Sequence, residues 1–229
     1  MQTPRIAAPA ALSTLAVLLV LSVSAPVYAV DAFEIQVYDG TANDPGQAGL
    51  ELHLNHVAKG AHVAEPPEEA PHRQTHATFE PSLGITKSWE LGGYFQTALL
   101  RDGTFAYAGA KLRSKLVTAP DFHPHVRLGI NVELARIPQR FEIDRWGIEL
   151  RPIAAWEDDD WLFAVNPIFS FALAGKDAGA PSFEPAVAAY RKVRGLVSFG
   201  VEYYGSIGKP YNPSPTNEQL HYLYGVGNL

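Results

Sequence analysis

Hydrophobic and polar residues alternate along most of this chain, and this alternation constrains the fold more than any other feature. Residues 50–55 read LELHLN, residues 126–135 read VRLGINVELA and residues 145–151 read RWGIELR. Successive side chains of a β-strand point to opposite faces, so a period of two predicts strands with one apolar and one polar face. Turn-forming residues such as Asp44-Pro45-Gly46 separate these stretches. We expect an all-β protein with no helix after residue 29 and with strands at 33–38, 47–57, 74–86, 89–100, 104–117, 125–136, 144–155, 160–173, 182–192, 195–205 and 219–229.

The length of the predicted strands favours a membrane-spanning barrel over a soluble β-sandwich. Many of them span ten or more residues, whereas strands of soluble proteins usually have about five or six. A tilted strand that crosses a membrane needs roughly 9–11 residues. Aromatic residues lie near the predicted strand ends, as in the aromatic girdles of outer-membrane barrels: Trp89, Tyr107, Trp146, Trp156, Trp161, Tyr203, Tyr204, Tyr222 and Tyr224. The predicted fold class is therefore an antiparallel transmembrane β-barrel of about 10–12 strands.

The N-terminus has the pattern of a secretory signal peptide. Arg5 is the only charged residue in the first 29, an apolar stretch follows at 11–23, and Val27 and Ala29 are the short side chains before a cleavage site after Ala29. The apolar stretch is shorter than the roughly 20 residues that a spanning helix needs. We expect a cleaved signal peptide at 1–29, an N-terminal lead-in segment at 30–46 and an outer-membrane β-barrel at 47–229.

The predicted connections differ in length, and this difference predicts an orientation. Outer-membrane barrels have short periplasmic turns and longer outer loops. Counting 47–57 as the first full strand places the long connections 58–72, 137–143, 173–181 and 206–218 outside the cell. The tight turns 87–88, 156–159 and 193–194 then face the periplasm, and ten long strands result. Because the sequence ends in mid-pattern at Gly227-Asn228-Leu229, we expect a complete barrel of twelve strands that lacks its last strands here.

Several strand fragments resemble a largely uncharacterised family of proteobacterial outer-membrane β-barrel proteins. These fragments are PGQ at 45–47, LELHLNHV at 50–57, WELGGY at 89–94, GINVEL at 129–134, WGIELRPI at 146–153, NPI at 166–168 and GVEYY at 200–204. The family is described as candidate transporters and is related to the meta-pathway phenol-degradation barrels. The resemblance runs from about Phe33 to the end and implies a fold and an outer-membrane location, because its motifs contain no catalytic signature.

The polar faces of the predicted strands would line the interior of such a barrel, because a Lys or Arg facing lipid costs about 2–4 kcal/mol at the membrane midplane. Lys111, Arg113 and Lys115 form a basic stripe on one strand. The candidate lumen-facing residues are Glu51, His53, Glu90, Lys111, Arg113, Lys115, Arg127, Glu133, Arg145, Glu149, Arg151 and Glu202. One interpretation is an interior packed with ion pairs, in which Glu90 and Glu133 pair with the basic stripe. The other is a narrow channel that selects small polar or anionic solutes.

The sequence predicts a passive transporter, narrow channel or structural barrel and no enzymatic activity, cofactor or metal. Serine and histidine residues are scattered, without a Gly-x-Ser-x-Gly motif. The stretch from His62 to His76 and the motif His123-Pro124-His125 could bind a metal weakly, although solvated loops explain them better. The alternatives are a soluble periplasmic lipocalin-like binder and an outer-membrane lipid-modifying enzyme.

The expected partners follow from the location and the charge. They are outer-membrane lipid, the barrel-assembly machinery and, as a candidate, a small polar solute. Nucleic acid is excluded because the chain has 24 Asp and Glu against 18 Lys and Arg, whereas nucleic-acid binding needs a basic surface. There are no cysteines, so an exported form would not depend on disulfides.

Overall fold

The structure is a computed structural model that describes residues 17–19, 33–60, 62–64, 66–175, 178–193 and 197–228. Within these ranges all regular secondary structure is β. The strands are β1 (Val17–Leu19), β2 (Ala48–His56), β3 (Thr75–Thr86), β4 (Trp89–Leu99), β5 (Phe105–Val117), β6 (Val126–Arg136), β7 (Trp146–Glu157), β8 (Trp161–Ala172), β9 (Pro181–Val193), β10 (Val197–Ser206), β11 (Gly208–Lys209), β12 (Asn212–Pro213) and β13 (Leu220–Asn228). A search of the described residues for a helix long and apolar enough to cross a bilayer finds none.

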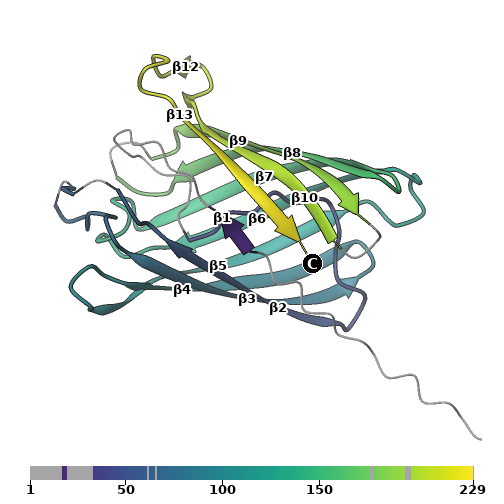
Figure 1. Ribbon diagram of the computed structural model, residues 1–229, viewed down its shortest axis with the longest axis horizontal. Coiled ribbons are helices and arrows are strands. Elements are labelled where there is room, and N and C mark those ends of the chain that lie inside the picture. The colour runs from purple at the N-terminus through teal and green to yellow at the C-terminus, as the bar shows by residue number, and fades with distance from the viewer. Residues whose placement is uncertain are drawn as a thin grey trace, which may run out of the picture.

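The strands form one antiparallel sheet that is curled, so that it has a convex and a concave face (Figure 1). The sheet order is β1-β13-β10-β9-β8-β7-β6-β5-β4-β3-β2, so each long strand pairs with the long strands before and after it in the sequence. Strand β1 covers only Gly225–Gly227 of β13, and β2 does not pair with β13 within the described part of the chain. The prediction of an all-β antiparallel sheet with ten long strands is confirmed.

The predicted strand boundaries agree with the structure to within about two residues, with two exceptions. Residues 33–38 form no strand, so the prediction of a strand there is wrong. Strand β7 continues to Glu157, so the turn predicted at 156–159 begins only after that residue. In this turn the Asp158 carboxylate accepts backbone hydrogen bonds from Asp160 and Trp161. These bonds stabilise the charged form and lower the pKa of Asp158. The predicted signal peptide lies outside the described residues, apart from β1.

The connections between strands are distributed unequally between the two ends of the sheet. Residues 57–74, 137–145, 173–180 and 207–219 connect strands at one end, named here the loop end. The connections 87–88, 118–125 and 158–160 lie at the opposite end, named the turn end. The loop end also has the short connection 100–104, and 118–125 at the turn end is as long as 173–180, so the predicted pattern of long and short connections is met only in part.

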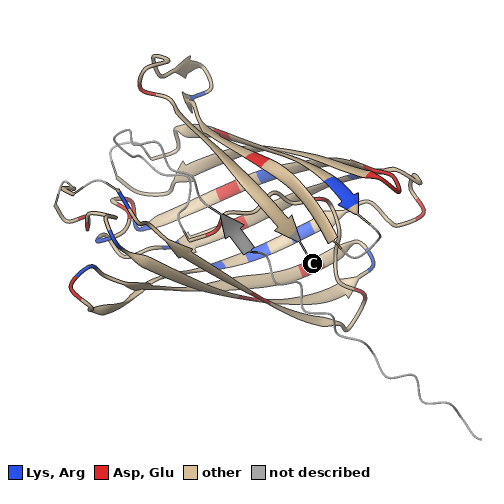
Figure 2. Cartoon of the chain, viewed as in Figure 1, with Lys and Arg blue, Asp and Glu red and all other residues tan. Residues whose placement is uncertain are grey.

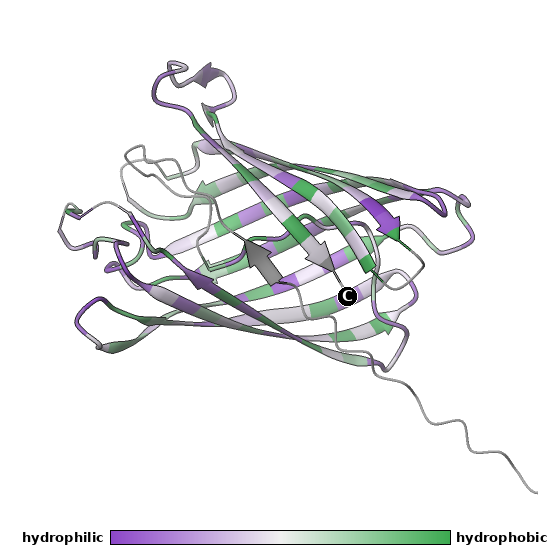
Figure 3. Cartoon of the chain, viewed as in Figure 1, coloured by the Kyte–Doolittle hydropathy of each residue, from purple (hydrophilic) through white to green (hydrophobic). Residues whose placement is uncertain are grey.

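The convex face of the sheet is apolar, whereas the concave face buries charged and polar side chains on β3–β7 and a cluster of alanine, tyrosine and aliphatic side chains on β7–β10 and β13. On β5, Leu112 is 68% exposed and the neighbouring Arg113 is 4% exposed. On β6, Ile130 is 38% exposed and Asn131 is fully buried. Figure 3 shows this alternation of hydropathy along the strands, and Figure 2 shows charged residues of both signs on the strands as well as in the loops.

Residues 33–46, named here the inner segment, lie against the concave face of the sheet. The Phe33 ring packs at 4.3 Å from the ring of His76, near the loop end. At the turn end, the Gly46 amide donates to the Gly84 carbonyl at 2.8 Å. A Cβ on Gly84 would lie 2.2 Å from the carbonyl oxygen of Asp44. Glycine at position 84 is therefore what allows the inner segment to approach β3 so closely.

Candidate functional site: the filled concave face

The inner segment is held in place by hydrogen bonds to its backbone. The side-chain amide of Asn166, on β8, accepts a hydrogen bond from the Tyr38 amide at 2.7 Å and donates to the Tyr38 carbonyl at 2.9 Å. Asn166 is fully buried. An unpaired buried amide or carbonyl costs free energy. Asn166 avoids this cost by pairing both backbone groups of Tyr38, as a neighbouring strand would.

Glu34, one of three acidic residues of the inner segment, lies among basic side chains of the sheet. Its carboxylate lies 3.2 Å from the ammonium nitrogen of Lys111 and 3.3 Å from Arg151. Lys111 also lies 3.2 Å from Glu133, and Arg151 lies 2.7 Å from Glu149. Glu34 is 3% exposed. Each of these charges has a partner of opposite sign, which a charge needs when it is removed from water.

Arg113 joins a second set of buried ion pairs nearer the turn end. Its guanidinium lies 2.7 Å from Glu80 and 2.7 Å from Glu90. Glu90 also pairs with Lys115 at 2.9 Å and accepts the backbone amide of Asn43 at 2.7 Å. Arg113 therefore connects β3, β4 and β5, while Glu90 connects the wall to the inner segment.

The Tyr38 ring lies among the basic side chains of the wall. The charged groups of Arg151, Lys115 and Arg113 lie 4.6, 5.2 and 5.8 Å from its centroid. These distances are within the range of cation–π attraction. The Tyr38 hydroxyl contacts the Tyr94 hydroxyl, which donates to Glu34 and Glu133. Tyr38 of the inner segment therefore contacts both the ion pairs around Glu34 and those around Arg113.

Two further groups complete the polar contacts of the concave face. Arg127, on β6, pairs with Asp39 of the inner segment at 3.5 Å and with Glu157 of β7. Glu202, on β10, accepts hydrogen bonds from the hydroxyls of Tyr190 and Tyr204. The inner segment therefore contacts charged groups over most of its length.

Little open space is left beside these contacts. A cavity bordered by Glu34, Glu149 and Arg151 has a volume of about 30 Å³, which is room for about one water molecule. A larger cavity of about 310 Å³ lies at the loop end, beside Glu69, Gln74 and Arg101. The inner segment and the ion pairs of Lys111 and Arg113 occupy the concave face beside the smaller cavity.

The structure places most of the candidate lumen residues on the concave face, buried or half-buried: His53, Glu90, Lys111, Arg113, Lys115, Arg127, Glu133, Glu149, Arg151 and Glu202. Glu51 is exposed on the edge strand β2, where it accepts a hydrogen bond from Gln36 at 3.1 Å. Arg145 precedes β7 and is exposed, and it donates to Gln139 in the same loop. The basic stripe pairs with Glu90 and Glu133 through Lys111, Arg113 and Lys115.

The sequence reasoning missed the contribution of the inner segment. Glu34, Tyr38 and Asp39 all contact the wall, and Tyr94 contacts Tyr38. One signal was available, because Glu34 is a single acidic residue in the otherwise uncharged stretch FEIQVY. That stretch also alternates like a strand, and this property led to the wrong prediction of a strand.

Among the described residues, one group of side chains could hold a metal ion: Glu51, His53 and Glu80. It includes none of the histidines that the sequence suggested as weak metal ligands. The His62 ring lies tilted against the His72 ring, with 3.8 Å between the ring centroids, and the His123 ring accepts a hydrogen bond from the backbone amide of His125.

Comparison of this chain with protein-family models, with curated proteins and with solved structures finds no match. The resemblance to proteobacterial outer-membrane barrels therefore stays a prediction.

Proposed function

We propose that this protein is an outer-membrane β-barrel whose lumen is closed by the inner segment. The observation that carries the proposal is the reversal of the two faces of the sheet. Large hydrophobic side chains are exposed on the convex face of every long strand, while charged groups are buried on the concave face. A continuous exposed apolar surface of this extent is expected where a protein meets lipid.

The dimensions of the strands and the positions of the aromatic residues support the same proposal. The long strands have 9 to 13 residues, which includes the roughly 9–11 that a tilted membrane strand needs. Trp89, Trp156 and Trp161 are exposed at the turn end. Tyr107 and Trp146 are exposed near the loop end. Two belts of aromatic residues, one at each membrane interface, are typical of outer-membrane barrels.

The proposal includes a closed barrel. Closure requires backbone pairing at the two ends of the sheet, in addition to the strand pairs given above. Unpaired backbone groups are not tolerated in the hydrocarbon core of a membrane. The edges of β2 and β13 must therefore find backbone partners in the bilayer, either in each other or in further strands. A soluble lipocalin-like barrel would place its polar face outward, opposite to the arrangement in this sheet.

Membrane fractionation followed by gel electrophoresis tests the location. We expect the protein in the outer-membrane fraction, and we expect the unheated sample to migrate differently from the boiled one, because a folded barrel resists detergent. Recovery in the soluble periplasmic fraction, with one mobility before and after boiling, would contradict the proposal and favour the lipocalin-like alternative.

The contacts of Glu34 and Tyr38 predict that the barrel is closed to ions while the inner segment is in place. In planar bilayers the intact protein should show no steady conductance. Deletion of residues 33–42 should produce a conducting pore, because it removes the groups that fill the middle of the lumen. The pore should conduct ions of both signs, since without Glu34 the cations Lys111 and Arg151 still pair with Glu133 and Glu149.

The control for this experiment is a test that the deletion variant folds. The variant must keep the heat-dependent mobility of the intact protein, so that the conductance is that of a folded barrel. Steady conductance of the intact protein, or a folded deletion variant that conducts no more than the intact one, would show that the inner segment does not close the lumen.

A further inference from the structure

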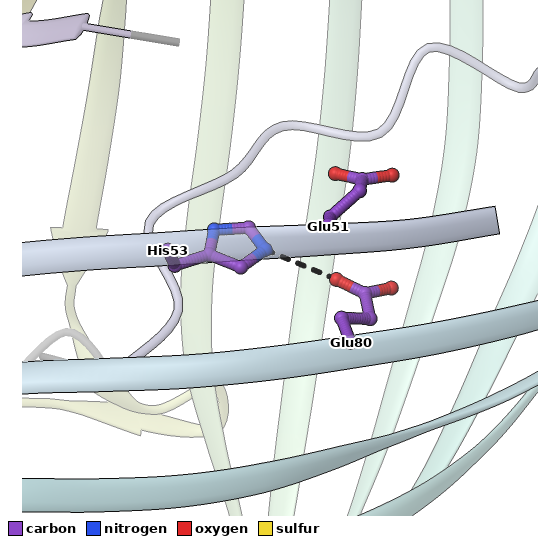
Figure 4. A group of neighbouring side chains, drawn as sticks. All are labelled: Glu51, His53 and Glu80. Carbon is purple, nitrogen blue, oxygen red and sulfur yellow. Dashed lines mark hydrogen bonds and ion pairs between the residues drawn. The ribbon is translucent and has the colours of Figure 1, made fainter. Parts of the chain in front are cut away.

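Three side chains on the edge of the sheet converge in an arrangement suited to a metal ion. Glu51 and His53 lie on β2, two residues apart, so both project from the same face of this strand. Glu80 lies on β3 directly opposite Glu51. Figure 4 shows the His53 ring directed at the Glu80 carboxylate, with Glu51 beside them on β2. Their ligand atoms all lie within 4.8 Å of one another, and His53 Nε2 is 3.1 Å from a carboxylate oxygen of Glu80.

The register of β2 and β3 places two carboxylates side by side. Like charges directly opposite one another on neighbouring strands destabilise a sheet unless a cation lies between them. Arg113 compensates Glu80 from one side but is shared with Glu90. The polar partner of Glu51 is the neutral amide of Gln36. A cation between Glu51 and Glu80 would remove this repulsion.

The connected set of charges on the concave face has more acidic than basic groups. Its carboxylates are Glu34, Glu51, Glu80, Glu90, Glu133 and Glu149. Its permanently charged cations are Lys111, Arg113, Lys115 and Arg151. With all six carboxylates ionised the difference is two negative charges, of which a protonated His53 would remove one. A divalent cation balances the set and leaves His53 neutral, which is the form that coordinates a metal.

We propose that Glu51, His53 and Glu80 bind a divalent transition-metal ion of the zinc class. One imidazole nitrogen and two carboxylates are a ligand set that this class accepts, with water or a solute in the fourth position. A tetrahedral ion with ligand bonds of about 2.0–2.1 Å holds its ligand atoms roughly 3.3 Å apart. Glu51 is exposed on the edge strand, so its side chain can move inward by the distance required.

The proposed site joins the wall to the inner segment. The Gln36 side chain donates to the Glu51 carboxylate and so would orient this ligand toward the ion. A bound ion would thereby stabilise the position of the inner segment against β2. The three ligands lie on β2 and β3, whose pairing is the same with or without a membrane location.

Zinc binding by the full chain tests the proposal. The folded protein is stripped with a chelator and titrated with Zn²⁺, alongside His53→Ala, Glu51→Gln and the control His56→Ala. His56 lies on the same strand but projects from the opposite face, where it contacts Thr75. The intact protein and His56→Ala should bind one ion more tightly than the other two variants, by a factor of at least about ten.

A second measurement guards against binding by other histidines. Zn²⁺ should raise the unfolding midpoint of the intact protein and of His56→Ala, and should not raise it for Glu51→Gln. Glu51 is exposed, so this variant is expected to fold. Equal zinc affinity and equal stabilisation in all four proteins would place any bound ion elsewhere and overturn the proposal, as would a failure of the intact protein to bind zinc.

Discussion

Replacing Arg113 by alanine is expected to lower the free energy of unfolding by about 3–5 kcal/mol, the amount typical of breaking a buried ion pair. Arg113 is 4% exposed and lies 2.7 Å from both Glu80 and Glu90. Without its guanidinium, the basic partner left to Glu80 among the described residues is His53, and the one left to Glu90 is Lys115. Urea unfolding of the protein in lipid vesicles, followed by tryptophan fluorescence, measures this loss.

Arg145→Ala is the matched control for this substitution. The sequence predicted both arginines to face the lumen. In the structure Arg145 is exposed in the loop before β7, and its side chain donates a hydrogen bond to the neutral amide of Gln139. A substitution at such a surface position usually changes stability by less than about 0.5 kcal/mol. If both variants lose the same small amount, the groups around Arg113 are in contact with water and the concave face is an open, solvated channel.

Replacing Ile130 by arginine is expected to destabilise the membrane-inserted protein by about 2–4 kcal/mol, because a charge at the bilayer midplane meets hydrocarbon. Ile130 lies in the middle of β6 on the convex face and is 38% exposed. In water an exposed position of this kind would accept arginine at little cost. The equilibrium between the unfolded chain and the vesicle-inserted barrel, measured as a function of urea concentration, gives the difference directly.

Ile143→Arg is the control that shows whether the cost of arginine at position 130 comes from contact with lipid. Ile143 has the same side chain and a similar exposed fraction of 46%, but it lies in the loop between β6 and β7. Under the proposed function this variant should be as stable as the original protein. Equal stability of the two arginine variants would mean that the convex face does not meet lipid, and would argue against the barrel proposed for the outer membrane.

The sequence alone determined the strands, because the alternation of side chains between two faces is a local property of an extended chain. The pattern in 126–135 predicted β6 to within a residue, and Lys111, Arg113 and Lys115 were correctly grouped on one face of β5. Since facing strands alternate in the same way, their pairing with Glu90 and Glu133 could also be anticipated.

Only the tertiary structure decided what fills the concave face. Residues 33–38 alternate like a strand, yet they bond to Asn166 and Lys111 rather than to a neighbouring strand. No local rule predicts this, because the free energy of burying Glu34 depends on cations that lie far away in the sequence. Likewise, Glu51 lies directly across from Glu80 because of the register between β2 and β3. Register is set by pairing along the whole strand, because a slip of one residue would turn every side chain to the other face.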